Sequence, residues 1–378
     1  MVSPSISYLG DDPSTVHRLN ACAYQQSALT TGFGFQYAAF YIEKEHRSPR
    51  LVTLARRRID DASLEAWQHL TFHDYEQTTD DGHNTISIGI CSADGTIHIA
   101  FDHHSDPLKY RVSRPGLAKD ARSESWVAES FGPICKRLPG ISNALSEMME
   151  EVTYPRFIDA DDRMFLEYRV GKAGAGSDVL FVYDPSSTDA GWGSFTEIIT
   201  TLDSNNLASG IHSQHAQLRA KEIPRNSGIM NQEAQFIDDA GGVHVLNREN
   251  TSGKERWYHY HGDASQGWKS IALPHICPTA TGPRGKLVYF KDKDLALYML
   301  PSNTTDELIL VKGLNVASED PTEFTTIWKD AGYAGEPLID EVALRDHARL
   351  SVFIIKQECD AKRKIAVLDF DLNDLLKE

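Results

Sequence analysis

The feature that most constrains this fold is a phrase that recurs along the chain: a turn with Asp or Gly, an alternating strand, and a second strand. The clear copies begin at Ala93 (ADGTIHIAFDHHSDPLKYRVSR), Ala160 and Asp239, weaker ones begin at Asp292 and Arg345, and a strand pair without the turn spans residues 35–59. Short alternating runs broken by Asp, Gly and Asn are typical of strands and turns. Helical patterns are confined to LSEMMEEV near residue 148 and DLNDLLKE at the end of the chain.

Copies of this phrase follow one another at intervals of roughly 50 to 80 residues, which fits propeller blades with insertions. A four-stranded blade cannot bury both of its faces alone, so blades pack side by side around an axis. Six to eight blades fit these copies. We predict an all-β, seven-bladed β-propeller formed by a single domain over residues 1–378, and residues 195–225 leave room for one further blade. The strand at IAVLDFDL should pair with an N-terminal strand and close the ring. A pair of β-sandwiches or a β-helix accommodates the long, variable insertions less well.

Composition excludes several classes of partner. The formal net charge of −16 argues against nucleic acid, because phosphate binding needs a basic face. The longest apolar runs, such as LSVFII, are far too short to span a membrane. The start MVSPSISYLGDD has no signal-peptide pattern, yet the sequons at Asn250 and Asn303 favour a secreted protein. Five cysteines without a CxxC motif indicate buried single thiols.

Two pairs of polar residues flank strand-turn-strand units. His83, in DGHN, precedes such a unit and His103, in FDHH, follows it, so the two should lie side by side at one rim. Tyr154, in TYPRF, and Arg169, in FLEYR, flank the next unit in the same way. The two histidines can be a metal pair, an acid/base pair or a coincidence. Polar residues at matched positions of adjacent blades predict a site at the mouth of the propeller.

This combination suits the cleavage of a uronate by β-elimination. The proton on C5 is weakly acidic, so a cation must neutralise the adjacent carboxylate while charge builds on it. The arginine fork grips a carboxylate at two points. Histidine and tyrosine can serve as the base for the C5 proton and the acid for the leaving oxygen. The reaction requires no cofactor.

The segment GHNTISIGICSADGTIHIAFDHH, with PLKYRVSR and TYPRF…FLEYRVG after it, resembles the BNR-repeat propeller family of polysaccharide lyases. That family includes bacterial ulvan lyases and the fungal L-rhamnose-α-1,4-D-glucuronate lyase that trims gum arabic. The detailed resemblance covers residues 80–172 and thins to blade-like phrasing beyond them. It implies a seven-bladed propeller with its site in a central cleft, and it leaves room for a structural Ca²⁺ ion in the channel.

Carried over by position, the resemblance makes His83, His103, Tyr154 and Arg169 the catalytic residues. Arg169, helped by His103, would neutralise the carboxylate, His83 or Tyr154 would take the C5 proton, and Tyr154 would protonate the leaving oxygen. The expected substrate-binding residues are Arg219, with Arg225 as its rival, Asn84, His104 and His212. The tryptophan-rich strand that the family has before this arginine is absent here.

Structural interpretations compete with several of these assignments. Tyr154 can be a packing residue, and Arg169 can pair with Glu167 or Asp162. His104 fits a supporting role better than a catalytic one. His212 and His215 can bind a metal or line the cleft. Further along the chain, Trp192 and Trp268 are expected to pack between blades, and His259 and His261 are expected on a blade surface.

We therefore expect a lyase that acts on an acidic polysaccharide or oligosaccharide and releases rhamnose-linked glucuronate ends. An ulvan lyase that acts within the chain is the first alternative. A sialidase-like hydrolase would need three clustered arginines and a Tyr–Glu pair, which we do not find in the sequence. A glycan-binding propeller without activity would not need His, Tyr and Arg at matched positions.

Overall fold

The computed structural model describes most of the chain. The described residues are 2–25, 27–44, 49–59, 66–160, 163–172, 176–185, 191–194, 221–229, 231, 233–263, 267–276, 283–302, 305–318, 323–357 and 362–377.

Six antiparallel sheets make up this part of the chain, and three come from its first half. The first sheet has the order β2 (Leu29–Gly32), β3 (Phe35–Glu43), β4 (Arg50–Arg58), β5 (Gln68–Thr71). The second has the order β6 (Ile86–Ile90), β7 (Ile97–Phe101), β9 (Tyr110–Val112). The third has the order β13 (Gly191–Ser194), β12 (Ser177–Asp184), β11 (Arg163–Val170), β10 (Val152–Ala160), β8 (His104–Asp106).

The other three sheets have four strands each. The fourth has the order β14 (Ala234–Ile237), β15 (Val243–Glu249), β16 (Arg256–Asp263), β17 (Gly267–Ile276). The fifth has the order β18 (Lys286–Phe290), β19 (Leu295–Pro301), β20 (Leu308–Leu314), β21 (Glu323–Asp330). The sixth has the order β1 (Ser5–Asp11), β24 (Arg363–Asp371), β23 (Arg349–Gln357), β22 (Tyr333–Ile339).

Helical segments are short and lie in the connections. Two are α-helical, α2 (Glu341–His347) and α3 (Leu372–Leu376). The 3₁₀ turns are η1 (Ala23–Gln25), η2 (Leu117–Lys119), η3 (Ser123–Ser125), η4 (Ala128–Ser130), η5 (Asn143–Met149) and η8 (Lys291–Lys293). The two segments expected to be helical from the sequence correspond to η5 and α3. Asp340 caps α2, because its side chain accepts a hydrogen bond from the Ala343 N–H.

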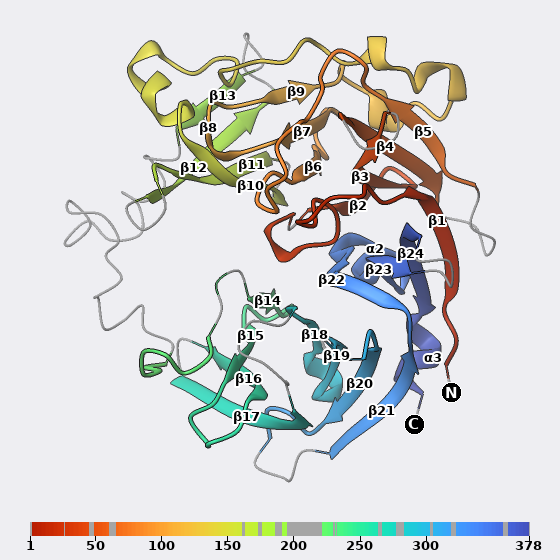
Figure 1. Ribbon diagram of the computed structural model, residues 1–378, viewed down its shortest axis with the longest axis vertical. Helices are drawn as coiled ribbons and strands as arrows, with labels where there is room; N and C mark the ends of the chain where they lie inside the picture. The colour runs from red at the N-terminus through yellow and green to blue at the C-terminus, as the bar shows by residue number, and fades with distance from the viewer. Residues whose placement is uncertain are drawn as a thin grey trace.

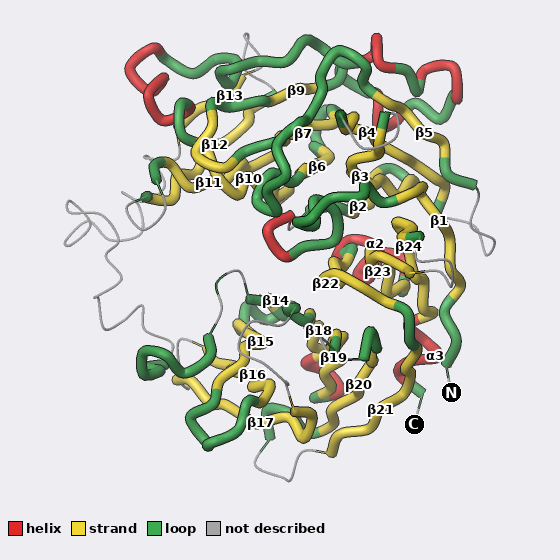
Figure 2. Tube along the Cα trace, in the orientation of Figure 1, coloured by secondary structure: helices red, strands yellow, loops and turns green. Residues whose placement is uncertain are grey.

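The sheets follow one another in chain order around a common centre, as the blades of a propeller do (Figures 1 and 2). The all-β prediction is therefore confirmed, with six propeller-like sheets in the described residues. Most of the segment proposed to conceal a further blade, residues 195–225, lies outside those residues. No described helix is both long and apolar enough to cross a membrane.

The recurring phrase of the sequence corresponds to neighbouring strands of each sheet. Its copies give β7 and β9, β11 and β12, β15 and β16, β19 and β20, and β23 and β24, and the strand pair at residues 35–59 gives β3 and β4. Strands β3, β4 and β19 are buried along nearly their whole length, because each sheet packs against its neighbours, whereas β11 and β12 bury mainly alternate residues. One apolar cluster joins Tyr37 and Leu54 of the first sheet to Ile86 and Ile99 of the second.

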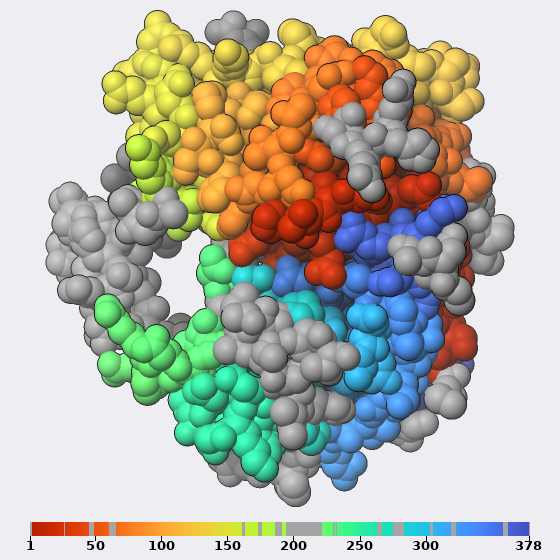
Figure 3. Space-filling view, viewed as in Figure 1, coloured from red at the N-terminus to blue at the C-terminus, as the bar shows by residue number. Residues whose placement is uncertain are grey.

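The two ends of the chain meet in the sixth sheet. Strand β1 pairs with β24 in an antiparallel register that places Ser5 opposite Asp369, which confirms the predicted pairing of the last strand with an N-terminal one. In the space-filling view the N-terminal residues lie directly against the C-terminal strands (Figure 3). A buried ion pair joins this sheet to the first one: Arg57 Nη2 lies 2.7 Å from Asp369 Oδ2, and both side chains are almost fully enclosed.

Two predictions about individual side chains are wrong and a third is confirmed. Trp192 is buried and donates from Nε1 to the Tyr110 hydroxyl of the neighbouring sheet, so it packs between blades as predicted. Trp268 is instead 37% exposed. His259, expected on a blade surface, is fully buried, and its ring nitrogens bond to His244 and Tyr298.

Free thiols account for the described cysteines. Cys22 and Cys91 are buried, as predicted, whereas Cys135 is only partly buried.

Candidate functional site

A cluster of aromatic and charged side chains lies at the strand ends where several sheets meet. Tyr24 comes from η1, His83 from the turn before β6, and Tyr154 from the start of β10. Tyr24 stacks on His83 with ring centroids 4.6 Å apart and on Tyr154 with centroids 5.2 Å apart. The rings of His83 and Tyr154 also lie close together, with centroids 5.8 Å apart. These three rings therefore pack against one another, and each restricts the orientation of the other two.

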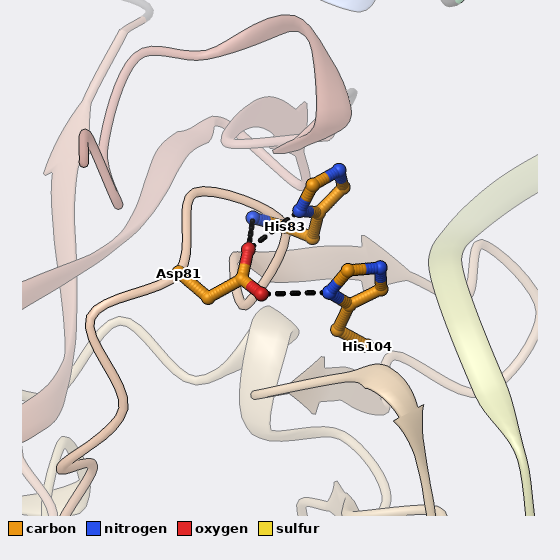
Figure 4. Close-up of side chains that lie close together, drawn as sticks. All are labelled: Asp81, His83 and His104. Atoms are coloured by element: carbon orange, nitrogen blue, oxygen red, sulfur yellow. Dashed lines mark hydrogen bonds and ion pairs between the residues drawn. The ribbon is translucent and has the colours of Figure 1, made fainter. Parts of the chain in front are cut away.

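One carboxylate holds two histidines in this cluster (Figure 4). Asp81 Oδ1 lies 2.5 Å from His83 Nδ1, and Asp81 Oδ2 lies 2.7 Å from His104 Nδ1. The two imidazole rings stack with centroids 4.0 Å apart. Partial burial opposes ionisation of Asp81, but hydrogen bonds from the His83 backbone and from both imidazoles lower its pKa well below its ordinary value. Asp81 is therefore an ionised acceptor for both rings.

Tyr154 occupies an unusual backbone conformation. Its φ is +59°, and the pairing of β10 with β11 shifts register between Thr153 and Arg156. A bulky residue with positive φ is strained by about 1–2 kcal/mol, and such strain persists only where the surroundings enforce it. A β-bulge of this kind re-aims a side chain that would otherwise point to the other face of the sheet. The bulge turns Tyr154 toward Tyr24 and Arg169.

Arg169, near the end of β11, lies over the ring of Tyr154, with its guanidinium carbon 4.9 Å from the ring centroid. Burial raises the pKa of Tyr154, assisted by the nearby Tyr24 and opposed by Arg169, so the phenol stays protonated at neutral pH. The Nε and Nη2 atoms of Arg169 are buried and have no hydrogen-bond partner among the described residues. Glu167, a proposed ion-pair partner of Arg169, bonds instead to Arg156 at 2.6 Å. Asp162, the other proposed ion-pair partner, lies outside the described residues. Within the described residues, Arg169 keeps two N–H donors without an acceptor.

A second arginine, Arg284, lies over the ring of Tyr24. Arg284, just before β18, has its guanidinium carbon 5.1 Å from the centroid of Tyr24. Its Nη1 bonds to Glu336 Oε1 at 2.8 Å, and its other nitrogens bond to the backbone oxygen and side chain of Asn231. Glu336 also accepts from the Ala23 N–H of η1. This buried pair fixes η1, and with it Tyr24, against the fifth and sixth sheets.

The second histidine of the predicted pair is His104, and this corrects the expectation that His103 lies beside His83. His103 is 1% exposed, and its Nε2 accepts the Lys109 N–H at 2.8 Å. Burial, with Lys109 nearby, lowers the pKa of His103 well below 6.5, so the ring is neutral. Both histidines follow β7, and Asp102, immediately before them, has a φ of +62° that turns the chain at this point.

Three other predicted substrate contacts either differ from expectation or lie outside the described residues. Asn84 is 2% exposed and donates to Asp102 Oδ1 at 2.7 Å, so it braces the turn that carries the histidines. Arg219 and His212 lie outside the described residues, and so does His215. Arg225, the alternative to Arg219, is exposed.

Asp81, His83 and His104 are the described residues whose ligand atoms converge closely enough to suggest a metal ion. Their nitrogen–oxygen separations of 2.5 and 2.7 Å are hydrogen-bond distances. Two ligands of one tetrahedral zinc ion lie about 3.3 Å apart, given metal–ligand bonds of about 2.0–2.1 Å. Calcium prefers six to eight oxygen ligands, and this trio offers a single carboxylate. The separations within this trio fit hydrogen bonds between Asp81 and the two imidazoles better than they fit a zinc or calcium ion.

Tyr24, Asp81, Arg284 and Glu336 belong to the cluster, and sequence reasoning missed all four. Asp81 lies in the motif DGHN, and its place two residues before His83 could have identified it. Arg284 immediately precedes an apolar first strand, as His83 does, and that shared position could have identified it. Tyr24 and Glu336 carry no such signal, since only the ring arrangement brings them to the site.

The fold and this cluster define a propeller-like protein with an arginine, tyrosine and histidine site where its sheets meet. A family model described as "BNR repeat-containing family member" matches residues 35–199 and 194–276, which together span more than half of the chain. The chain belongs to this family.

Solved structures of polysaccharide lyases share the fold. The polysaccharide lyase Uly1 superposes with a TM-score of 0.66 at 14% identity, over 98% of this chain and 100% of that one. A PL25 ulvan lyase gives a TM-score of 0.60 at 13% identity over 95% of each chain. Its complex with -[GlcA(1-4)Rha3S]- gives 0.61 at the same identity and coverage. A comparison with curated protein sequences finds no match.

Proposed function

We propose that this protein is a polysaccharide lyase that cleaves the bond to O4 of a uronate by β-elimination. The observation that carries the proposal is Arg169, whose buried Nε and Nη2 donors lack partners among the described residues and lie beside the Tyr154 ring. An unpaired buried donor is costly, and a bound carboxylate would satisfy both donors at once. The fold shared with lyases of known structure supports the same class of reaction.

In the proposed mechanism the guanidinium of Arg169 binds the carboxylate on C5 and stabilises charge that develops there. His83 takes the C5 proton on Nε2, with Tyr154 as the alternative base. The released electron pair forms the C4–C5 double bond, and the bond from C4 to the leaving oxygen breaks. The Tyr154 hydroxyl gives its proton to that oxygen. Burial keeps the Tyr154 phenol protonated, which is the state that an acid needs before the reaction.

The roles of the second histidine follow from its position. His104, stacked on His83, replaces His103 as the partner in the site. His103 has one ring nitrogen occupied by the Lys109 N–H and is enclosed by protein, so we assign it no contact with substrate. Arg219 and His212 stay proposed substrate contacts. The reaction as written uses no metal or cofactor.

We propose glucuronate linked to rhamnose as the substrate, with release of rhamnose-capped ends as in the fungal enzyme that the sequence resembles. The solved relative bound to -[GlcA(1-4)Rha3S]- supports the same pair of sugars and keeps internal cleavage of ulvan as the alternative. We further propose a single, secreted catalytic propeller of seven blades.

The test is incubation of the full chain with gum arabic and, separately, with ulvan. The C4–C5 double bond of the product absorbs ultraviolet light, so absorbance that grows on one polymer identifies both the reaction and the substrate. New reducing ends without absorbance would instead indicate a hydrolase and refute the proposed elimination. Neither signal on either polymer or on their glucuronate oligosaccharides would leave binding without catalysis as the function.

A further inference from the structure

A single carboxylate in the site serves two imidazoles at once. We propose that Asp81 is a positioning residue that holds His83 and His104 with the ring proton on Nδ1, which leaves Nε2 of each ring as a free base. The Nδ1 atoms face Asp81, and the Nε2 atoms point away from it (Figure 4). The catalytic meaning of this arrangement rests on the proposed lyase function, whereas the proton positions do not.

The proton positions follow from hydrogen-bond chemistry. An ionised carboxylate can only accept, so a ring nitrogen that bonds to it must carry a hydrogen. Asp81 meets His104 Nδ1 at 2.7 Å, the length of a charge-assisted hydrogen bond, and its separation of 2.5 Å from His83 Nδ1 is shorter still. Asp81 Oδ1 also accepts the backbone N–H of His83 at 3.0 Å. The side chain is thus held at both oxygens, and each oxygen serves one ring.

This arrangement prepares one proton acceptor rather than two. A base that takes a proton on Nε2 becomes a cation, and the carboxylate on its Nδ1 side stabilises that charge. The rings are stacked with centroids 4.0 Å apart, so a charge on one disfavours a charge on the other. Tyr24 covers the other face of His83 at 4.6 Å and prevents the ring from turning away.

The variant Asp81→Asn separates the two histidines. The amide oxygen keeps the position of Oδ1, because that position accepts the His83 backbone N–H and His83 Nδ1–H. The amide NH₂ then faces His104 Nδ1, which must accept, so the His104 proton moves to Nε2. In ¹⁵N NMR spectra of the full chain we expect Nδ1–H imidazoles for His83 and His104 in the wild type. In D81N we expect His83 unchanged and His104 switched.

The matched control is Asp80→Asn, the same change one residue away. Asp80 accepts the backbone N–H groups of Val16 and His17 and touches neither ring of the pair. D80N should leave both imidazole spectra as in the wild type. On the polymer that the protein cleaves, D81N should lower kcat about 100-fold, because the imidazolium that forms on His83 loses the carboxylate that stabilises its charge. KM should change less than about threefold, because the contacts that bind substrate remain.

Three results would overturn the inference. The first is an Nε2–H proton on either histidine of the wild type. The second is a His104 signal that does not change in D81N. The third is stoichiometric zinc binding by the wild type that D81N abolishes, since a metal would occupy the Nδ1 atoms. The NMR measurements need no substrate, so absence of activity on every polymer would refute the lyase proposal and leave the proton positions to be judged separately.

Discussion

The guanidinium carbon of Arg169 lies 4.9 Å from the ring centroid of Tyr154, across a β-bulge that gives Tyr154 a left-handed backbone. The bulge makes this contact possible, because in a regular register β10 would place the side chain at residue 154 on the other face. A carboxylate bound to Arg169 would therefore lie next to a phenol. The group proposed to neutralise the carboxylate, Arg169, therefore lies beside the proposed proton donor, Tyr154.

Arg169→Lys tests the arginine fork. Lysine keeps the charge but offers a single ammonium, so it cannot bind both carboxylate oxygens in the plane of a guanidinium. We expect kcat/KM to fall about 100- to 1,000-fold, the usual cost of one lost transition-state donor. Growth of ultraviolet absorbance on the cleaved polymer measures it. Arg163→Lys, at the exposed far end of β11, should act as the wild type, and near-normal turnover by R169K would contradict the proposed role.

Tyr154→Phe removes the proposed acid and keeps the ring that stacks on Tyr24. The leaving oxygen would then depart without a proton, and we expect kcat to fall about 100-fold or more. The melting temperature should stay close to that of the wild type, because the phenylalanine ring preserves the packing. A variant with near-normal kcat would show that the tyrosine is not the acid.

The recurring phrase in the sequence predicted the sheets well because it reports a local property. Half-buried strands alternate apolar and polar residues, and strands buried on both faces run apolar. The turns between them need Asp, Gly or Asn. The closure by β1 and β24 followed from the same logic, since an open ring would leave an unpaired edge. The number of blades is a property of the whole ring, which no local pattern carries.

The site was predictable in part for a similar reason. His83, Tyr154 and Arg169 lie at strand ends, and position along a strand can be read from alternation. Which of His103 and His104 faces His83 depends on the positive φ of Asp102, which cannot be predicted from the sequence. Tyr24 reaches the site only because the ring closes and Glu336 holds η1 in place.

Asp369→Asn should weaken the junction between the first and sixth sheets. Asp369 binds Arg57 through both oxygens, and both side chains are buried. Removing one charge of a buried pair leaves the other uncompensated, which costs about 3–5 kcal/mol. Urea unfolding should show a loss of this size. Asp11→Asn breaks the exposed pair with Lys364 and should cost less than about 1 kcal/mol, so equal losses in the two variants would refute the argument.

Asp12 should make stability depend on pH. Burial raises its pKa from 3.8 to about 6, against the opposing effects of Arg363 and Asn20. A carboxyl with a raised folded-state pKa binds its proton more tightly when folded, so its contribution is complete below about pH 4 and is lost as pH rises through about 6. The loss amounts to about 3 kcal/mol, from a shift of about two pKa units.

Asp12→Asn should remove this loss. The free energy of unfolding of D12N, relative to the wild type, should therefore rise between about pH 4 and pH 7. Other titrating groups cancel in the difference, and D11N provides a neighbouring control. A difference that stays flat across this range would show that the raised pKa is wrong.

Gly89 in β6 allows the strand that carries Tyr154 to approach. A Cβ at residue 89 would lie 2.4 Å from Phe157 Cβ and 2.8 Å from its Cγ, both on β10. Because such atoms cannot share that space, Gly89→Ala must push β10 away from β6, at a cost of about 1–3 kcal/mol. We expect a lower unfolding midpoint in urea, together with weaker turnover, since the displaced strand carries Tyr154. At Gly193 the nearest atom to an added Cβ, Val182 O, is 4.0 Å away, so Gly193→Ala is the matched control and should preserve both properties. If G89A were as stable and as active as G193A, the spacing of β6 and β10 would not set the position of Tyr154.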